Sequence, residues 1–93
     1  MSSCEEFHSP YDLFRRLSNG DSVFIVKLVS PKISGIYPFI NEKDARIFMK
    51  ENHRQYTKGY FSDEKIEVFP VNESIQFQMG DDKYYVGFYK IDP

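Results

Sequence analysis

The sequence predicts a small single domain of the α+β class over residues 1–93, with helices packed on one side of a mainly antiparallel sheet. Three observations lead to this prediction: an unbroken apolar run at 22–29, helical spacing of apolar residues from 42, and alternating apolar residues between 74 and 91. The expected order is α-β-β-α-β-β-β. The 93 residues, 41% of them hydrophobic, suffice for one modest core.

The first helix is expected in the stretch SPYDLFRRLSNG. Ser9 is a good N-cap, Pro10 suits the first helical position, and Gly20 is a natural stop. The residues expected to form its buried stripe are Leu13, Phe14 and Leu17. Residues 1–8 are expected to be a flexible arm.

Two strands should follow this helix. The run SVFIVKLV at 22–29 is rich in β-branched residues and too short for a solitary helix, so it is predicted to be a central strand buried on both faces. The stretch IYPFI at 36–40 is predicted to be the next strand. Pro38 cannot donate a ladder hydrogen bond, so this strand should lie at an edge or stop pairing there.

The clearest helix is expected from Glu42 to about His53, with Asn41 as its N-cap. At 100° per residue one side of this helix is suited to burial. That side carries Ala45, Phe48, Met49 and Asn52.

The remaining chain is predicted to form an antiparallel meander of three strands. The first is KIEVFPV at 65–71, and the second is SIQFQM, with Ile75, Phe77 and Met79 turned inward. The third, YYVGFYKI at 84–91, follows a GDDK turn and has apolar residues on both faces. We expect it either to be interior or to present its second face to another surface.

A cationic stripe runs along the side of the second helix opposite its buried side. The stripe continues into the aromatic stretch HRQYTKGYF. The predicted partner-binding surface comprises Lys43, Arg46, Ile47, Lys50, Arg54, Tyr56, Lys58 and Tyr60. The alternative interpretation is a merely solvated face, in which Glu42 pairs with Arg46 and the loop aromatics enter the core.

The distribution of charge favours a protein partner for this stripe. Residues 1–58 carry nine Lys and Arg against seven Asp and Glu, whereas residues 59–93 carry three against seven, and the net charge is −2. A chain so balanced has no global attraction for nucleic acid or anionic membrane. Acidic residues beside the stripe would weaken phosphate binding, but an acidic surface on a larger protein tolerates mixed charge. Single-stranded nucleic acid bound on the same residues is the alternative.

Tyrosines of the last strand form a second candidate surface. Tyr84, Tyr85 and Tyr89 would be available for edge-strand addition if this strand lay at the sheet edge, and homodimerisation would be the simplest consequence. The alternative is that one tyrosine face packs beneath a helix and the other is half covered.

No catalytic or metal site is predicted. Cys4, His8 and Asp12 are spaced by four residues, but they belong to a terminal arm without an oxyanion-binding turn. Asp81 and Asp82 suit a hairpin turn better than a cation site. No stretch matches the glycine-rich loops that bind the phosphate groups of cofactors.

These features together predict a small non-catalytic protein-binding module, an adaptor or a stoichiometric inhibitor, of the size common among viral and mobile-element accessory proteins. The chain has one cysteine, and its first residues lack the cationic and apolar pattern of a secretory leader. We therefore expect a cytoplasmic protein with no cofactor and no membrane association.

Overall fold

The protein folds as an antiparallel sheet with helices on one side, in a computed structural model that describes residues 10–32, 34–57, 59 and 61–93, with side chains from Phe14 onward. The elements are α1 (Pro10–Ser18), β1 (Val23–Val29), β2 (Ser34–Phe39), α2 (Glu42–Thr57), α3 (Asp63–Glu67), β3 (Glu73–Met79) and β4 (Asp82–Ile91). The predicted fold class is confirmed. No helix in the described part of the chain is long and apolar enough to cross a membrane.

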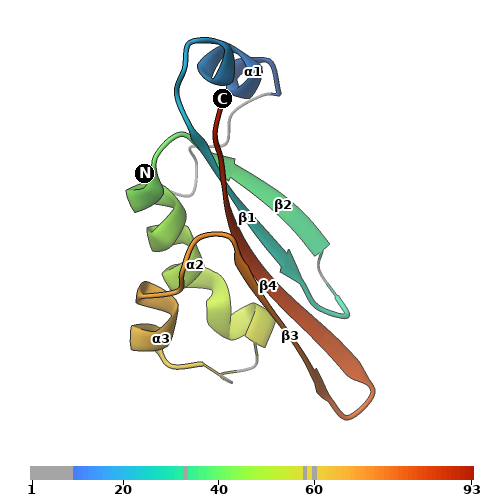
Figure 1. The fold of residues 1–93 in the computed structure, drawn as a ribbon. Coiled ribbons are helices and arrows are strands. Elements are labelled where there is room, and N and C mark those ends of the chain that lie inside the picture. Colours follow the sequence, from blue (N-terminus) through green and yellow to red (C-terminus); the bar gives the residue numbers. More distant parts are fainter. Residues whose placement is uncertain (1–9, 33, 58, 60) are drawn as a thin grey trace.

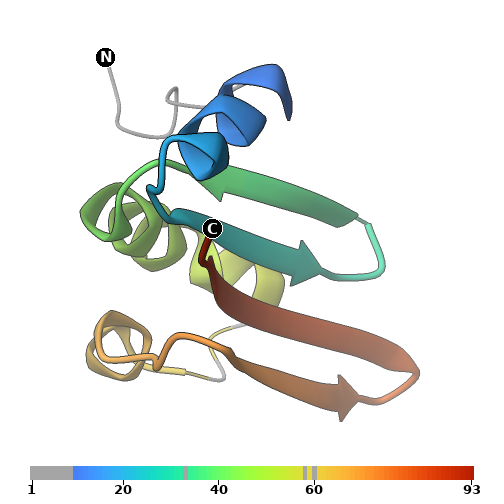
Figure 2. The same ribbon diagram turned by 45° about the horizontal axis from the view of Figure 1, so that its top comes forward.

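The sheet has four strands in the order β2-β1-β4-β3 (Figure 1). All three pairings are antiparallel, and β1 lies between β2 and β4 with Val26 opposite both Tyr37 and Phe88. The prediction that the first strand is central and the Pro38 strand is an edge is therefore confirmed. Figure 2 shows β2 and β3 as the two outer strands.

The fifth element is a short helix, α3, where a strand over residues 65–71 was predicted. Ser62 caps this helix, and its hydroxyl accepts a hydrogen bond from the Lys65 amide at 3.3 Å. Acidic Asp63 in the first turn suits the positive end of the helix. The strand prediction relied on alternation around Ile66 and Val68, which would place both side chains on the same face. Ile66 is buried, but Val68 is 74% exposed, so the alternation fails.

The core lies between one face of the sheet and the helices α2 and α3, which share one side of the sheet in Figures 1 and 2. Phe24, Val26 and Leu28 of β1 are buried on this side, whereas Ile25, Lys27 and Val29 on the other side are only half-buried. The prediction that β1 is buried on both faces is wrong. The reason is that α2 and α3 cover a single face.

Helix α2 begins as predicted, because the Asn41 side-chain oxygen accepts a hydrogen bond from the Asp44 amide at 2.8 Å. Its buried side contains Phe48 and Met49 as expected, together with Ala45. Asn52 is half-buried, and its amide donates to the Phe48 carbonyl. The helix runs four residues past its predicted end, to Thr57, and this extension buries Tyr56 and Thr57. His53, at the predicted end, is also buried.

Helix α1 lies beyond the end of the sheet at which β1 begins (Figure 1). Gly20 ends it with a φ of +88°, a conformation that glycine adopts readily. Phe14 is 70% exposed, so the prediction that it is buried is wrong, while Leu17 is half-buried. Because α1 lies beyond the end of the sheet, it has little sheet surface to cover. Leu13 and the predicted arm at 1–8 are outside the described side chains.

The meander retains the predicted alternation in part. Ile75 and Phe77 of β3 are half-buried, and Gln76 and Gln78 are exposed. Met79 is exposed instead of inward. It lies at the hairpin end of the sheet, opposite Asp82, at the very end of the strand.

Candidate functional site

The cationic stripe is present on α2, but it is less open than the sequence suggested. Lys43, Lys50 and Arg54 are exposed, whereas Arg46 and Ile47 are half-buried. Helical spacing of three and four residues places all five on one side of α2. This part of the predicted surface is therefore assembled as expected.

The aromatic part of the predicted surface is not assembled in the same way. Tyr56 is only 4% exposed and belongs to the core, where its hydroxyl lies 3.1 Å from that of Tyr37. Burial and this hydrogen bond raise the pKa of Tyr56 above its ordinary value. Lys58 and Tyr60 lie outside the described residues. Tyr56 therefore offers no surface to a partner in this conformation.

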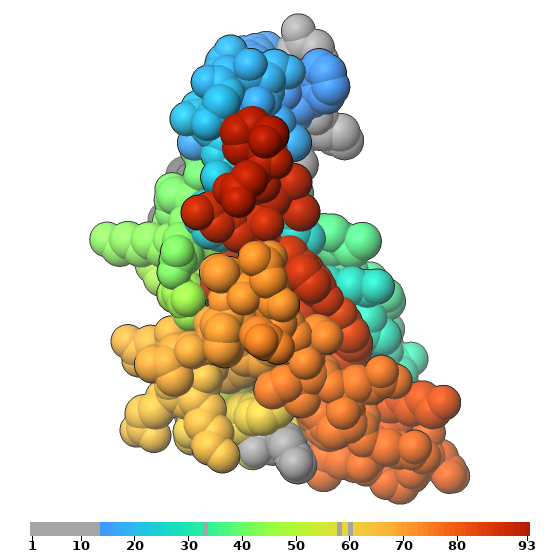
Figure 3. Space-filling view, in the orientation of Figure 1, coloured from blue at the N-terminus to red at the C-terminus, as the bar shows by residue number. Residues whose placement is uncertain are grey.

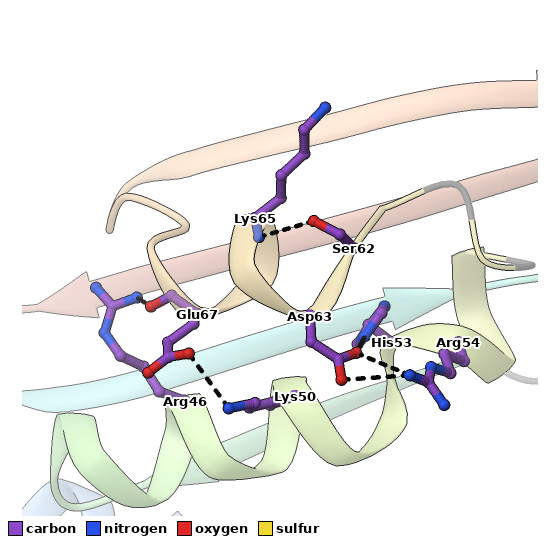
Figure 4. Close-up of polar contacts among 8 residues, drawn as sticks. All are labelled: Arg46, Lys50, His53, Arg54, Ser62, Asp63, Lys65 and Glu67. Atoms are coloured by element: carbon purple, nitrogen blue, oxygen red, sulfur yellow. Dashed lines mark hydrogen bonds and ion pairs between the residues drawn. The ribbon is translucent and has the colours of Figure 1, made fainter.

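Arg46 joins α2 to the last residue of α3, Glu67 (Figure 4), and to Phe69 just beyond it. One guanidinium nitrogen, Nη1, donates to the carbonyl oxygens of Glu67 at 3.0 Å and Phe69 at 2.8 Å. The Nε atom donates to Glu42 one turn earlier at 2.7 Å, and the guanidinium lies 5.0 Å from the centre of the Phe88 ring. Arg46 thus satisfies backbone acceptors at the end of α3, which is a structural role.

Two acidic residues of α3 pair with two further cations of the stripe, Lys50 and Arg54. Glu67 lies 3.2 Å from the Lys50 ammonium, and Asp63 lies 3.3 Å from the Arg54 guanidinium (Figure 4). The buried His53 ring donates from Nε2 to Asp63 at 2.7 Å. This hydrogen bond, supported by the charge of Arg54, holds the pKa of Asp63 below its usual value. Helix α3 therefore neutralises much of the stripe.

A shallow hollow remains open on the stripe, with a volume of about 510 Å³. Its lining comprises Glu42, Lys43, Arg46, Ile47, Lys50 and Glu67. Lys43 makes no ion pair with a residue that the structure describes. The hollow thus combines one unpaired ammonium, the half-buried Ile47 and paired charges at its rim.

A second hollow lies on the other side of α3, between that helix and the edge strand β3. It has a volume of about 360 Å³ and a mainly apolar lining. The lining comprises Phe61, Lys65, Val68, Phe69, Pro70, Glu73, Ser74 and Ile75. Figure 3 shows α3 and the segment after it, in yellow and orange, raised on the surface beside β3.

Sequence reasoning missed this second hollow because it assigned the same residues to a strand. The signal that could have revealed it is Ser62 followed by Asp63 and Glu64, which is an N-cap with acidic residues in the first turn. Pro70 then limits the helix to a short one.

The tyrosines of the last strand are placed differently from the predicted edge contact. Strand β4 is paired on both sides, with β1 and β3, so the prediction of edge-strand addition through Tyr84, Tyr85 and Tyr89 is wrong. Tyr84 is 2% exposed and stacks on Phe77, with ring centres 5.2 Å apart. Of the two expectations for this strand, the interior position is confirmed.

Tyr85 and Tyr89 lie on the face of the sheet that no described helix covers. They are half-buried, and their hydroxyl groups are hydrogen-bonded to each other. Both rings bend over Gly87, where an added Cβ atom would lie 2.7 Å from the Tyr89 ring and 2.9 Å from the Tyr85 ring. The hydrogen bond between the two tyrosine hydroxyl groups lowers the pKa of Tyr85 and raises that of Tyr89.

Within the described part of the chain, no group of three or more His, Cys, Asp and Glu side chains is arranged to hold a metal ion. Comparison of the chain with models of protein families, with curated proteins and with solved structures found no match. The surfaces of the chain are therefore the features from which its function is inferred.

Proposed function

We propose that the chain is a non-catalytic protein-binding module that associates stoichiometrically with an acidic surface of a larger protein, as an adaptor or an inhibitor. The observation that carries the proposal is the open hollow on α2, where Lys43 and Lys50 flank Ile47. A carboxylate of the partner would meet these two ammonium groups, and an apolar side chain would cover Ile47. The proposal places this association in the cytoplasm, because a chain with one cysteine is suited to a reducing compartment.

Mixed charge around the hollow supports a protein partner over nucleic acid. Glu42 and Glu67 line the same hollow as the lysines, and they would repel a run of phosphates. A protein surface can match cations and anions in register, and complementary pairs of this kind set specificity and association rate. Single-stranded nucleic acid on the same face is the less well supported alternative, because Tyr56 is buried and cannot stack on a base there.

The test is capture of a partner from a nuclease-treated lysate of the native host, with tagged wild-type chain and two variants. The first variant carries Lys43→Glu and Lys50→Glu. The second is a control of equal net charge, with Lys32→Glu and Lys90→Glu, at two lysines that do not line the hollow. We expect one protein at about equal molar amounts with the wild type and the control, and its loss with the first variant.

The variants also separate binding from folding. Lys50 contributes one exposed ion pair, so the thermal midpoint of the first variant should stay close to that of the wild type. Undiminished capture of the same protein by the first variant would remove the proposed surface. Capture of nucleic acid alone, from lysate without nuclease, would favour the alternative.

A further inference from the structure

We infer that the chain has a second contact site, at which an extended basic segment of a protein partner adds to β3 as a fifth strand and seats an apolar side chain in the groove between β3 and α3. The inference goes beyond the α2 hollow, because it names a different surface and a different chemistry. It rests on the proposed function only in requiring a protein partner.

The first observation is an unprotected sheet edge. Strand β3 is the outer strand on one side, and no other strand of the described residues pairs with its free edge. Natural edge strands are commonly blunted by proline, lysine or a bulge. The other edge strand, β2, contains Gly35 and Pro38, whereas β3 reads ESIQFQM and contains no proline, glycine or cation.

The second observation is the apolar groove that runs beside this edge. Phe61, Phe69, Pro70 and Ile75 contribute to its lining. Val68, which also lines the groove, is the most exposed large hydrophobic residue among the described side chains, at 74%. Peptides that add to a sheet edge obtain affinity from backbone hydrogen bonds and specificity from pockets for alternate side chains. An open edge and an adjacent apolar groove are the two parts that this mode of binding requires.

The charge along the β3 edge indicates which kind of peptide segment would bind there. Four carboxylates on α3, β3 and the hairpin make no ion pair with a described residue. They are Glu64, Glu73, Asp81 and Asp82. Lys65 and Lys83 are the cations of the same region, which leaves the edge net negative. A segment with lysine or arginine among its apolar residues complements this charge.

The same charge argues against a second copy of the chain as the occupant. Pairing of β3 with its counterpart would bring together two edges that are both net negative. Like charges across an interface disfavour association. The α2 hollow and the β3 edge also differ in sign, so they would not compete for one segment of a partner.

The test is selection from a random decapeptide display library by the full-length chain. We expect enrichment of peptides with apolar residues at alternate positions and with lysine or arginine between them. Enrichment of acidic peptides, or of none, would overturn the inference. Methylation of backbone nitrogens on one edge of a selected peptide should abolish its binding, and methylation on the other edge should not. Equal effects of the two methylation patterns would rule out strand addition.

The variant Val68→Asn tests the groove directly. Because Val68 is largely exposed, the variant should fold, with its thermal midpoint as the check. We expect its affinity for a selected peptide to fall at least tenfold, while the Lys43→Glu, Lys50→Glu variant binds the peptide like the wild type. Unchanged affinity in Val68→Asn would overturn the inference. So would a concentration-dependent dimer of the wild type, seen by sedimentation, that Val68→Asn abolishes.

Failure of this site is distinguishable from failure of the proposed function. If the lysine reversals abolish partner capture and peptides are not selected, only the β3 site is refuted. If peptides are selected and the lysine reversals leave capture unchanged, only the α2 surface is refuted.

Discussion

Replacement of Arg46 by methionine should weaken the attachment of α3 to α2 and lower the free energy of unfolding by about 2 kcal/mol. Methionine keeps most of the apolar stem of the arginine and removes its donors, so the change isolates the polar contacts. The Arg46 side chain is 26% exposed and donates to the carbonyl oxygens of Glu67 and Phe69. These acceptors lose their protein donor in the variant.

The magnitude follows from the separate contacts. The half-buried hydrogen bond to Phe69 contributes about 1 to 1.5 kcal/mol and the exposed one to Glu67 about 0.5 kcal/mol. The ion pair with Glu42 adds about 0.3 to 0.5 kcal/mol, and the contact with the Phe88 ring adds about 0.5 kcal/mol. Because a single guanidinium makes all four contacts, their energies are not independent, and their sum is an upper bound on the loss of stability.

The assay is urea denaturation at pH 7, followed by far-ultraviolet circular dichroism, with the slope on urea as a check that the unfolding transition is unchanged. Lys50→Met is the matched control, because it removes a single exposed ion pair and should cost less than about 1 kcal/mol. A loss in Arg46→Met no larger than the loss in the control would refute the idea that Arg46 anchors α3.

Two further predictions concern titrating groups. Because the pKa of Asp63 is lowered in the folded state, mainly by the hydrogen bond from His53, its contribution to stability is present above the ordinary aspartate pKa of about 4 and is lost as the pH falls through the folded value. Asp63→Asn should therefore be less stable than the wild type at pH 7 in urea denaturation, and the gap should narrow as the pH falls below about 4. A constant gap would contradict this account. Gly87→Ala should push the Tyr85 and Tyr89 rings apart, so that ultraviolet titration shows their two displaced pKa values returning toward about 10. Unchanged pKa values would show that the contact between the two tyrosines does not depend on Gly87.

Local signals in the sequence were sufficient for much of the fold. Asn41 and the helical spacing after it predicted the start and the buried side of α2, and Pro38 predicted an edge strand. These predictions succeed because capping and proline chemistry act over a few residues. The error in the predicted end of α2 affected the predicted partner-binding surface. A helix that continues to Thr57 places Tyr56 on the buried side with Met49 and Asn52, so Tyr56 would not have been assigned to that surface.

The two hollows beside α3 depend on contacts that no local pattern contains. Helix α3 docks on α2 through pairs such as Lys50 with Glu67, which are 17 residues apart. The groove beside β3 exists only once residues 63–67 are helical and β3 is an edge strand. The order of strands was likewise not determined by the sequence pattern, so both an interior position and an edge position of β4 stayed open until its pairing was known.

Hydrogen–deuterium exchange of the chain, free and bound to the protein that it captures, tests the central claim most directly. If the partner binds at the α2 hollow and at the β3 edge, amides in residues 42–50 and 61–79 should exchange more slowly in the complex, and those of β2 should be unchanged. Protection confined to β1 and β2, with α2, α3 and β3 exchanging as in the free chain, would contradict the proposed surfaces.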